Sequence, residues 1–219
     1  MHVIGIHLLL DVIHQAMAER GRADFFASGD EFVYYSIPQA REVAAGRPRF
    51  RGPDFFFIDQ VEGRDTRLRK GWVSWEEGGR LPDVIVELLS PSTEKIDRTV
   101  KMELYARTFR TRDYFLCDFD AGTLEGFRLV GDAYQPMLPG SRGRIRSEVL
   151  GLDFGIWHGA YRTQEGTWLR LFEPGGRMVP TEAEAERERA DAERERAEAA
   201  EARAAAAEAE LARLRARLG

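Results

Sequence analysis

The last part of the chain has a composition that leaves room for little except a helix. From about Thr181 to Gly219 the sequence is almost entirely Ala, Glu, Arg and Leu, with no proline and with glycine only at the final position. These are the strongest helix formers, and a run of this length predicts one long helix. We therefore expect two parts, a folded domain over residues 1–180 and a helical tail over residues 181–219.

The tail also carries a weak apolar seam. Its members are spaced alternately by three and four residues until Glu193 interrupts them: Leu218, Leu214, Leu211, Ala207, Ala204, Ala200, Ala197 and Ala190. Heptad spacing of this kind favours a coiled coil, and hence a homodimer joined through the tail. Because most seam positions are alanine, the alternative is a single solvated helix stabilised by Glu–Arg pairs four residues apart.

The domain before the tail is long enough to bury a hydrophobic core, since 43% of the chain is hydrophobic and 11% aromatic. Its single cysteine, Cys117, cannot form an internal disulfide and indicates a buried thiol in a reducing compartment. The first residues, "MHVIGIHLLLDVIHQAMAERG", have no basic start and no cleavage site, and they are too polar to span a bilayer. They predict an amphipathic helix that ends at Gly21, in a cytoplasmic protein.

Charge does not by itself indicate a nucleic-acid-binding protein. The net charge is −5, and the tail's 11 acidic residues and 8 arginines account for −3 of it, which leaves −2 for residues 1–180. Two short segments are basic, "RDTRLRK" at 64–70 and "SRGRIR" at 141–146. Either could contact nucleic acid, although such segments are more often solvated loops.

Within the domain, short apolar stretches separated by Gly, Pro and charged turns predict several strands. The clearest are "GPDFFFID", residues 83–89, and a group of three strands that turn at Ala121–Gly122 and Gly131–Asp132. A helix is predicted to begin near Ser92 and Thr93. Its buried face is predicted from its apolar residues, Val100, Leu104 and Met102.

One strand contains an acidic residue in an unexpected place, because Glu87 interrupts the apolar run 84–89. Burying a carboxylate costs several kcal/mol unless a partner neutralises it. Side chains alternate along a strand, so Asp83 and Glu87 share a face but lie about 13 Å apart and cannot ligate one ion together. Asp54 opens another strand, and if the two strands are antiparallel neighbours, Asp54 and Glu87 converge. An arginine-paired structural glutamate remains the alternative.

A lysine is the second unusual residue near this strand. The chain has 29 arginines but only three lysines, so Lys101 points to a task that arginine cannot perform, such as giving up a proton. It lies in the helix that follows the strand, with Tyr105 one turn further on the same face. The alternative is a salt bridge between Asp97 and Lys101 on the helix surface, worth a few tenths of a kcal/mol.

The order "RGPDFFFID … WEEGGRLPDVIVELLSPSTEKIDRTVKMELYA … YFLCDF" resembles the Uma-two family of restriction-endonuclease-like proteins, within the PD-(D/E)XK nuclease superfamily. The resemblance covers roughly residues 25–180. It implies an α/β (α+β) fold, a mixed β-sheet flanked by helices, with a divalent-metal site at its centre. On that pattern Asp54 matches the first metal-binding acid and Glu87 the second.

The resemblance has one departure and one open position. The superfamily's lysine normally stands two residues after the second acid, where this chain has Leu89. Lys101 then matches the place where some relatives carry the glutamine of a Q-x-x-x-Y motif, and "KMELY" fits that spacing. Asp83 is also typical of the family, either as part of the site or as a strand-start residue that pairs with a loop backbone.

The function implied is a Mg²⁺-dependent (or Mn²⁺-dependent) endonuclease that hydrolyses phosphodiester bonds in DNA. Asp54 and Glu87 hold the ion, which lowers the pKa of a bound water, while Lys101 orients that water or stabilises negative charge. Asp83 completes the set of candidate catalytic residues. The alternative is a catalytically inactive, nuclease-derived binding or scaffold module that self-associates through its C-terminal helix.

Overall fold

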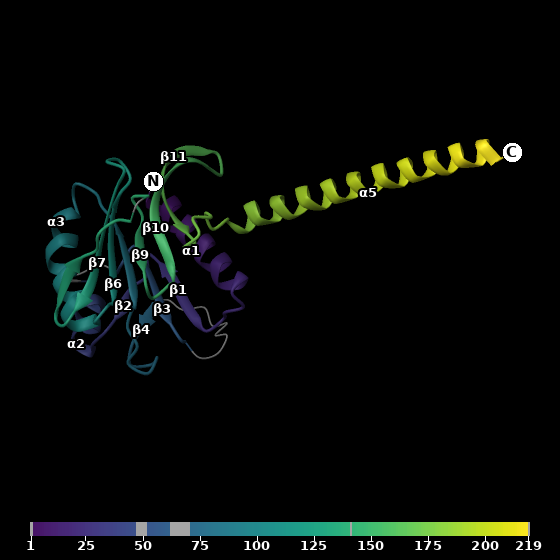
Figure 1. Ribbon diagram of the computed structural model, residues 1–219. Coiled ribbons are helices and arrows are strands. Elements are labelled where there is room, and N and C mark those ends of the chain that lie inside the picture. Colours follow the sequence, from purple (N-terminus) through teal and green to yellow (C-terminus); the bar gives the residue numbers. More distant parts are fainter. Residues whose placement is uncertain (1, 47–51, 62–70, 141, 219) are drawn as a thin grey trace. The chain divides into compact units, whose positions relative to one another are not determined.

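The chain forms two units, Met1–Val179 and Pro180–Gly219. The structure is a computed structural model, shown in Figure 1, and it describes residues 2–46, 52–61, 71–140 and 142–218. The first unit contains every strand of the described part of the chain, and the second is a helix.

A six-stranded mixed sheet forms the centre of the first unit, in the order β1-β3-β5-β6-β7-β8. Strands β5 and β6 run parallel, whereas the other neighbours are antiparallel. The predicted strands and turns within 113–137 are confirmed as three strands. The bounds are β1 Phe25–Gly29, β3 Phe55–Asp59, β5 Val84–Leu88, β6 Asp113–Asp118, β7 Thr123–Val130 and β8 Ala133–Pro136.

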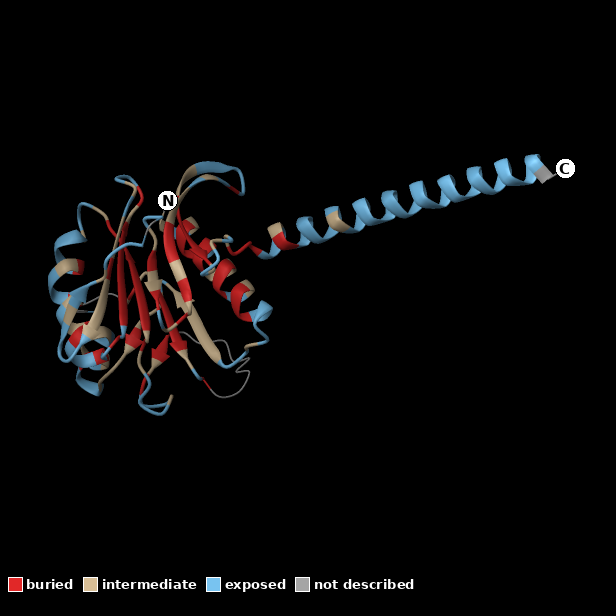
Figure 2. Cartoon of the chain, in the orientation of Figure 1, coloured by how far each residue is buried: buried red, intermediate tan, exposed pale blue. Residues whose placement is uncertain are grey.

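One face of this sheet is covered by helix α1 and by a second, three-stranded sheet in the order β11-β10-β9. Val84, Val86 and Leu88 of β5 point into the core that these elements enclose, and buried residues gather along the strands and on α1 in Figure 2. Helix α1 ends before Gly21, which has φ +65°, as the sequence predicted. The bounds are α1 His2–Glu19, β9 Ile145–Ser147, β10 Leu152–Tyr161 and β11 Gln164–Phe172.

The other face is covered by a helix over residues 94–109 and by a small parallel pair, β2 and β4. Ile85 and Leu89 point into this second core, so the side chains of β5 alternate as the sequence predicted. Glu87 belongs to the same face. The bounds are β2 Val33–Tyr34, α2 Ile37–Ala44, β4 Trp72–Val73, α3 Glu94–Ile96, η1 Asp97–Lys101, α4 Met102–Leu104 and η2 Tyr105–Phe109.

The helix over 94–109 alternates short α-helical segments with two π-helical ones, η1 and η2. The wider π turns bring residues spaced by four onto one line, and the buried residues of the helix include Asp97, Lys101, Tyr105 and Phe109. The prediction that Val100 belongs to the buried face is therefore wrong, because its relative exposure is 56%. Leu104 and Met102 are partly buried against the core.

The second unit confirms the long helix, α5, over Glu182–Leu218. Thr181 and Glu184 begin it with a capping box: the Thr181 N–H donates to Glu184 Oε2 at 2.7 Å, and the Glu184 N–H donates to Thr181 Oγ1 at 3.2 Å. Leu211 and Leu214 are large hydrophobic side chains about half exposed. No helix in the described part of the chain is long and apolar enough to cross a membrane.

Candidate active site

Strand pairing brings the two predicted acids together. In the antiparallel pair of β3 and β5, Phe55 faces Val86, so the residue before β3 lies beside Glu87. Asp54 Oδ2 accepts a hydrogen bond from the Leu88 N–H at 2.7 Å, and the Asp54 N–H donates to Glu87 Oε2 at 3.4 Å. The prediction that Asp54 and Glu87 lie close together is therefore confirmed.

Glu87 is fully buried, and both of its carboxylate oxygens have donors. Lys101 Nζ lies 2.7 Å from Oε2, and the Tyr105 hydroxyl donates to Oε1 at 2.7 Å. The glutamate is therefore paired with lysine and tyrosine, and the arginine-paired alternative is wrong. We refer to Asp54, Glu87, Asp97, Lys101 and Tyr105 as the Glu87 cluster.

Lys101 makes both of the contacts that the sequence left as alternatives. Besides Glu87, its Nζ lies 2.9 Å from Asp97 Oδ1, in an i,i+4 ion pair. This pair is buried, because the side chains of Asp97 and Lys101 are 1% and 9% exposed. It is thus no surface salt bridge, and Lys101 connects the helix to strand β5.

The Glu87 cluster has three carboxylates but one ammonium group, and burial together with these charges shifts the pKa values of its members. The pKa of Glu87 is raised to about 8, mainly by burial and also by the nearby Asp54, while Lys101 acts in the opposite direction. Burial also raises the pKa of Asp54, against the lowering effects of the Leu88 N–H, Lys101 and His2. For Lys101, burial alone lowers the pKa, but Glu87 and Asp97 outweigh it, so the pKa is raised.

Asp83 lies apart from these residues, at the start of β5. Its Oδ2 accepts a hydrogen bond from the Asp59 N–H at 2.8 Å, and its Oδ1 pairs with Arg112 Nη2 at 3.1 Å. These are the contacts of a strand-start residue that pairs with a neighbouring backbone. The structure does not bring Asp83 to the Glu87 cluster, and its predicted catalytic role gains no support from these contacts.

The sequence of this chain matches the profile of a known protein family. The sequence profile of Uma2, described as "Putative restriction endonuclease", matches residues 4–164. The chain belongs to the Uma2 family. The predicted resemblance is confirmed, and membership supports a nuclease in general terms, and with it contact with nucleic acid.

Other comparisons add less to the Uma2 assignment. A crystal structure from Anabaena variabilis, described as "a putative nuclease belonging to DUF820", is similar with 16% identity and a TM-score of 0.44. The alignment covers 68% of this chain and 73% of that one. No curated protein matches.

Restriction-endonuclease-like families such as Uma2 generally use divalent metal ions, and the donors of the Glu87 cluster fit such an ion. Asp54 and Glu87 provide adjacent carboxylates, and Mg²⁺ is usually bound through one or two carboxylates together with waters and substrate phosphates. A cation here also reduces the excess of negative charge. The described residues contain no group of three or more His, Cys, Asp or Glu side chains arranged to hold an ion.

Asp97 is a member of this site that the sequence did not indicate. The sequence suggested only a surface pair between Asp97 and Lys101, whereas Asp97 is buried within the Glu87 cluster. Its spacing of four from Lys101, and of eight from Tyr105, is the signal that could have identified it. Leu89, at the usual lysine position, is 6% exposed and packs in the core instead. The basic segment 64–70 lies outside the described residues.

Proposed function

We propose that this chain is an endonuclease that hydrolyses phosphodiester bonds in DNA and depends on Mg²⁺ or Mn²⁺. The observation that carries the proposal is the contact of 2.7 Å between Lys101 Nζ and Glu87 Oε2. A lysine supplied by the helix reaches the second acid even though Leu89 occupies the usual lysine position. The same acid lies beside Asp54, so two carboxylates and one ammonium group share one site.

In this proposal Asp54 and Glu87 hold the ion. When bound, the ion polarises the phosphodiester and lowers the pKa of a coordinated water. Lys101 stays protonated, because its pKa is raised, and its positive charge stabilises negative charge that develops on the phosphate. The raised pKa favours this electrostatic role over that of a general base.

Two further residues act as positioning residues. Tyr105 holds Glu87 through a hydrogen bond of 2.7 Å, and its own pKa is raised by burial and by Glu87, so it remains a donor. Asp97 holds Lys101 from the preceding turn of the helix. Both fix side chains that would otherwise lose their orientation in a buried site.

A second candidate function is a catalytically inactive binding or scaffold module. It is favoured by one observation: Glu87 already has protein donors on both oxygens, and its pKa of about 8 lets it rest neutral in the core without an ion. In either case we propose that the chain forms a homodimer through α5, whose exposed Leu211 and Leu214 provide the apolar contact.

DNA cleavage separates the two functions. Purified chain is incubated with supercoiled plasmid in Mg²⁺, in Mn²⁺ and in excess EDTA. We expect nicked or linear DNA with either ion and none with EDTA, and loss of cleavage in Asp54→Asn. Asp83→Asn tests the remaining predicted catalytic residue, and its contacts with Asp59 and Arg112 lead us to expect that most cleavage is retained.

Three results contradict the proposal. Undamaged DNA at all ion concentrations, with folded protein confirmed by circular dichroism, favours the inactive module. Cleavage that persists in EDTA removes the metal dependence. Equal cleavage by Asp54→Asn and the wild type removes Asp54 from the site.

A further inference from the structure

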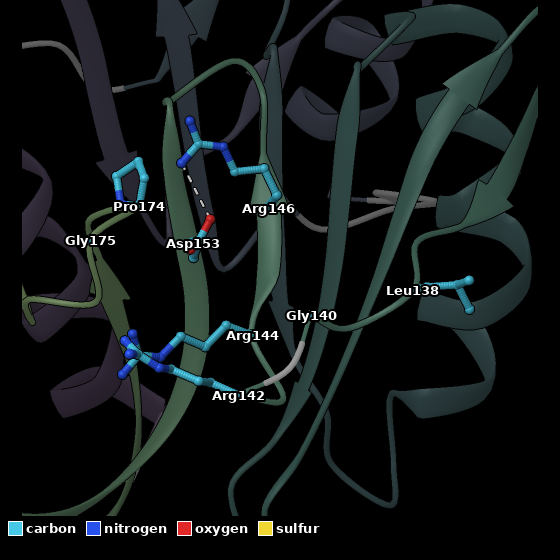
Figure 3. Close-up of a pocket in the computed structure, with 8 residues that line it drawn as sticks. All are labelled: Leu138, Gly140, Arg142, Arg144, Arg146, Asp153, Pro174 and Gly175. Atoms are coloured by element: carbon cyan, nitrogen blue, oxygen red, sulfur yellow. Dashed lines mark hydrogen bonds and ion pairs between the residues drawn. The ribbon is translucent and has the colours of Figure 1, made fainter.

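A pocket of about 400 Å³ shares no lining residue with the Glu87 cluster and lies at the three-stranded sheet β11-β10-β9 and the turns beside it. Figure 3 shows its lining, which includes three arginines from the segment before and within β9: Arg142, Arg144 and Arg146. The turn after β11 contributes Gly175, and β10 contributes Asp153. This is the basic segment 141–146 of the sequence, and the proposed catalysis does not use it.

The pocket carries more positive than negative charge. Arg146 Nη1 pairs with Asp153 Oδ1 at 3.3 Å, so these two charges offset each other. Within residues 2–46, 52–61, 71–140 and 142–218, neither Arg142 nor Arg144 has a carboxylate within ion-pair distance. Two guanidinium groups of the pocket therefore have no direct ion-pair partner among the described residues.

Arg144 is held in place by its surroundings. Its guanidinium carbon lies 3.4 Å from the centroid of the Phe172 ring, and its Nη1 donates to the Gly176 carbonyl at 3.2 Å. The stem of the side chain passes so close to Gly155 that a Cβ there would lie 3.0 Å from Arg144 Cγ. The head group is thus oriented before any ligand arrives, which reduces the entropy lost on binding.

Arg142 reaches the same place from the adjacent turn. Arg142 Nη1 lies against Gly176, where a Cβ would overlap it, and the φ of +95° at Gly176 is one that favours glycine. The heads of Arg142 and Arg144 lie together in Figure 3, and both approach Gly176. Burial lowers the pKa of Arg144, and the charge of Arg142 lowers it further, while the charge of Asp153 acts in the opposite direction without cancelling the shift.

We propose that the Arg142–Arg144 pocket binds a phosphate group, and that this phosphate belongs to the backbone of the nucleic acid. Guanidinium groups bind phosphate through paired N–H donors, and two adjacent forks match its several oxygens. The choice of nucleic acid as the source rests on the proposed nuclease function. The pocket then provides a contact that holds the substrate without taking part in cleavage.

The test compares the double variant Arg142→Gln/Arg144→Gln with the wild type. Arg107→Gln is the control for charge loss, because it removes one positive charge from an exposed helix position that is already paired with Glu103. Binding to a labelled, phosphodiester-linked DNA duplex is measured by fluorescence anisotropy in EDTA at several salt concentrations. Binding of inorganic phosphate is measured by calorimetry, and circular dichroism checks the fold.

We expect the double variant to bind DNA at least about tenfold more weakly. The slope of log K against log salt should fall by about two, since two phosphate-contacting charges are lost. Weaker binding of inorganic phosphate alone, with DNA binding unchanged, supports a phosphate site but overturns the nucleic-acid source. A double variant that matches Arg107→Gln with both ligands, or a wild type that binds neither, overturns the proposal.

The experiments distinguish a failure of the phosphate-site proposal from a failure of the proposed nuclease function. If the wild type cleaves DNA while the double variant binds DNA and phosphate normally, only the pocket assignment fails. If the wild type binds DNA through these arginines but never cleaves it, the catalytic proposal fails and the pocket assignment stands.

Discussion

The carboxylate of Glu87 has no exposed surface, yet the protein surrounds it with donors from Lys101, Tyr105 and the backbone of Asp54. The burial of an acid is costly even when it is paired, and replacing such a group often stabilises a fold. At the scale of single residues, stability alone therefore does not account for the Glu87 cluster, which agrees with the catalytic role that we propose for it. Two predictions follow from its charges.

The first prediction concerns pH. The pKa of Glu87 is about 8 in the folded chain and near 4.5 without the fold's influence, so between about pH 4.5 and pH 8 the folded state holds a proton on Glu87 that the unfolded state has released. The unfolding free energy of the wild type should therefore fall as pH rises from about 5 to 8, by at most about 1.4 kcal/mol per pH unit. Glu87→Gln should lack this decline.

Chemical denaturation in EDTA at pH 5, 6.5 and 8 measures the effect. Glu103→Gln makes the same exchange at a position whose side chain is 66% exposed, and it should follow the wild type. If Glu87→Gln also follows the wild type across this range, Glu87 does not titrate as its burial implies.

The second prediction concerns Lys101. Lys101→Arg keeps the charge but places a wider, planar head in a site only 9% exposed, between Glu87 and Asp97. We expect cleavage to fall about a hundredfold, as small misplacements of such groups can cost. Lys95→Arg, at an exposed position of the same helix, should leave the rate unchanged. An unchanged rate in Lys101→Arg would assign Lys101 a purely structural role.

The sequence predicted this site in part, and the reasons are physical. Asp54 and Glu87 could be brought together because the start of one strand meets the end of an antiparallel neighbour, a relation that depends only on strand direction. The burial of Asp97 was not predicted, since an acidic residue in a helix is usually solvated and its spacing from Lys101 and Tyr105 is only a weak signal. It depends on the lysine beside it and on the turn of the helix, which strand patterns do not reveal.

At the scale of elements, the helix over 94–109 differs most from expectation. The sequence prediction selected Val100 because it is apolar. The buried line of this helix, which contains the π segments η1 and η2, instead runs through Asp97, Lys101, Tyr105 and Phe109, and two of these are charged. The strands were easier to predict, because their alternation depends only on which face each residue occupies, as the two cores on either side of β5 illustrate.

A pair of truncations tests this helix face. Phe109→Ala removes a ring that is 4% exposed, and it should lower the unfolding free energy by about 3–5 kcal/mol. Val100→Ala removes a side chain that is 56% exposed, and it should change stability by less than about 0.5 kcal/mol. Urea denaturation measures both. Equal losses in the two variants would contradict the assigned face.

At the scale of the whole molecule, the chain combines a folded unit with a helical one. Helix α5 has 37 residues and is about 55 Å long at 1.5 Å per residue. Its composition alone predicted the helix, because helix formers without Pro or internal Gly specify their own local structure. Pairing of this helix with a second copy is harder to predict from the sequence. A seam made mostly of alanine buries little area and so gives only a weak signal for association.

The tail should mediate self-association and should be dispensable for folding of the first unit. We expect a chain truncated after Pro180 to sediment as a monomer, with an unfolding midpoint like that of the full-length protein, which should sediment as a dimer. Leu211→Ala/Leu214→Ala should weaken the dimer, because these residues supply most of its apolar contact. Equal sedimentation of the truncated and full-length chains would exclude the tail as the association element.

Cleavage of plasmid DNA by Glu87→Gln, in Mg²⁺ and beside the wild type, tests the central claim most directly. The amide keeps the size of the side chain and can still accept a hydrogen bond, but it removes the charge that would hold the ion. The account predicts a folded variant, by circular dichroism and thermal melting, whose cleavage is abolished. A Glu87→Gln protein that cleaves as fast as the wild type would contradict it, because the buried glutamate would then have no part in the reaction.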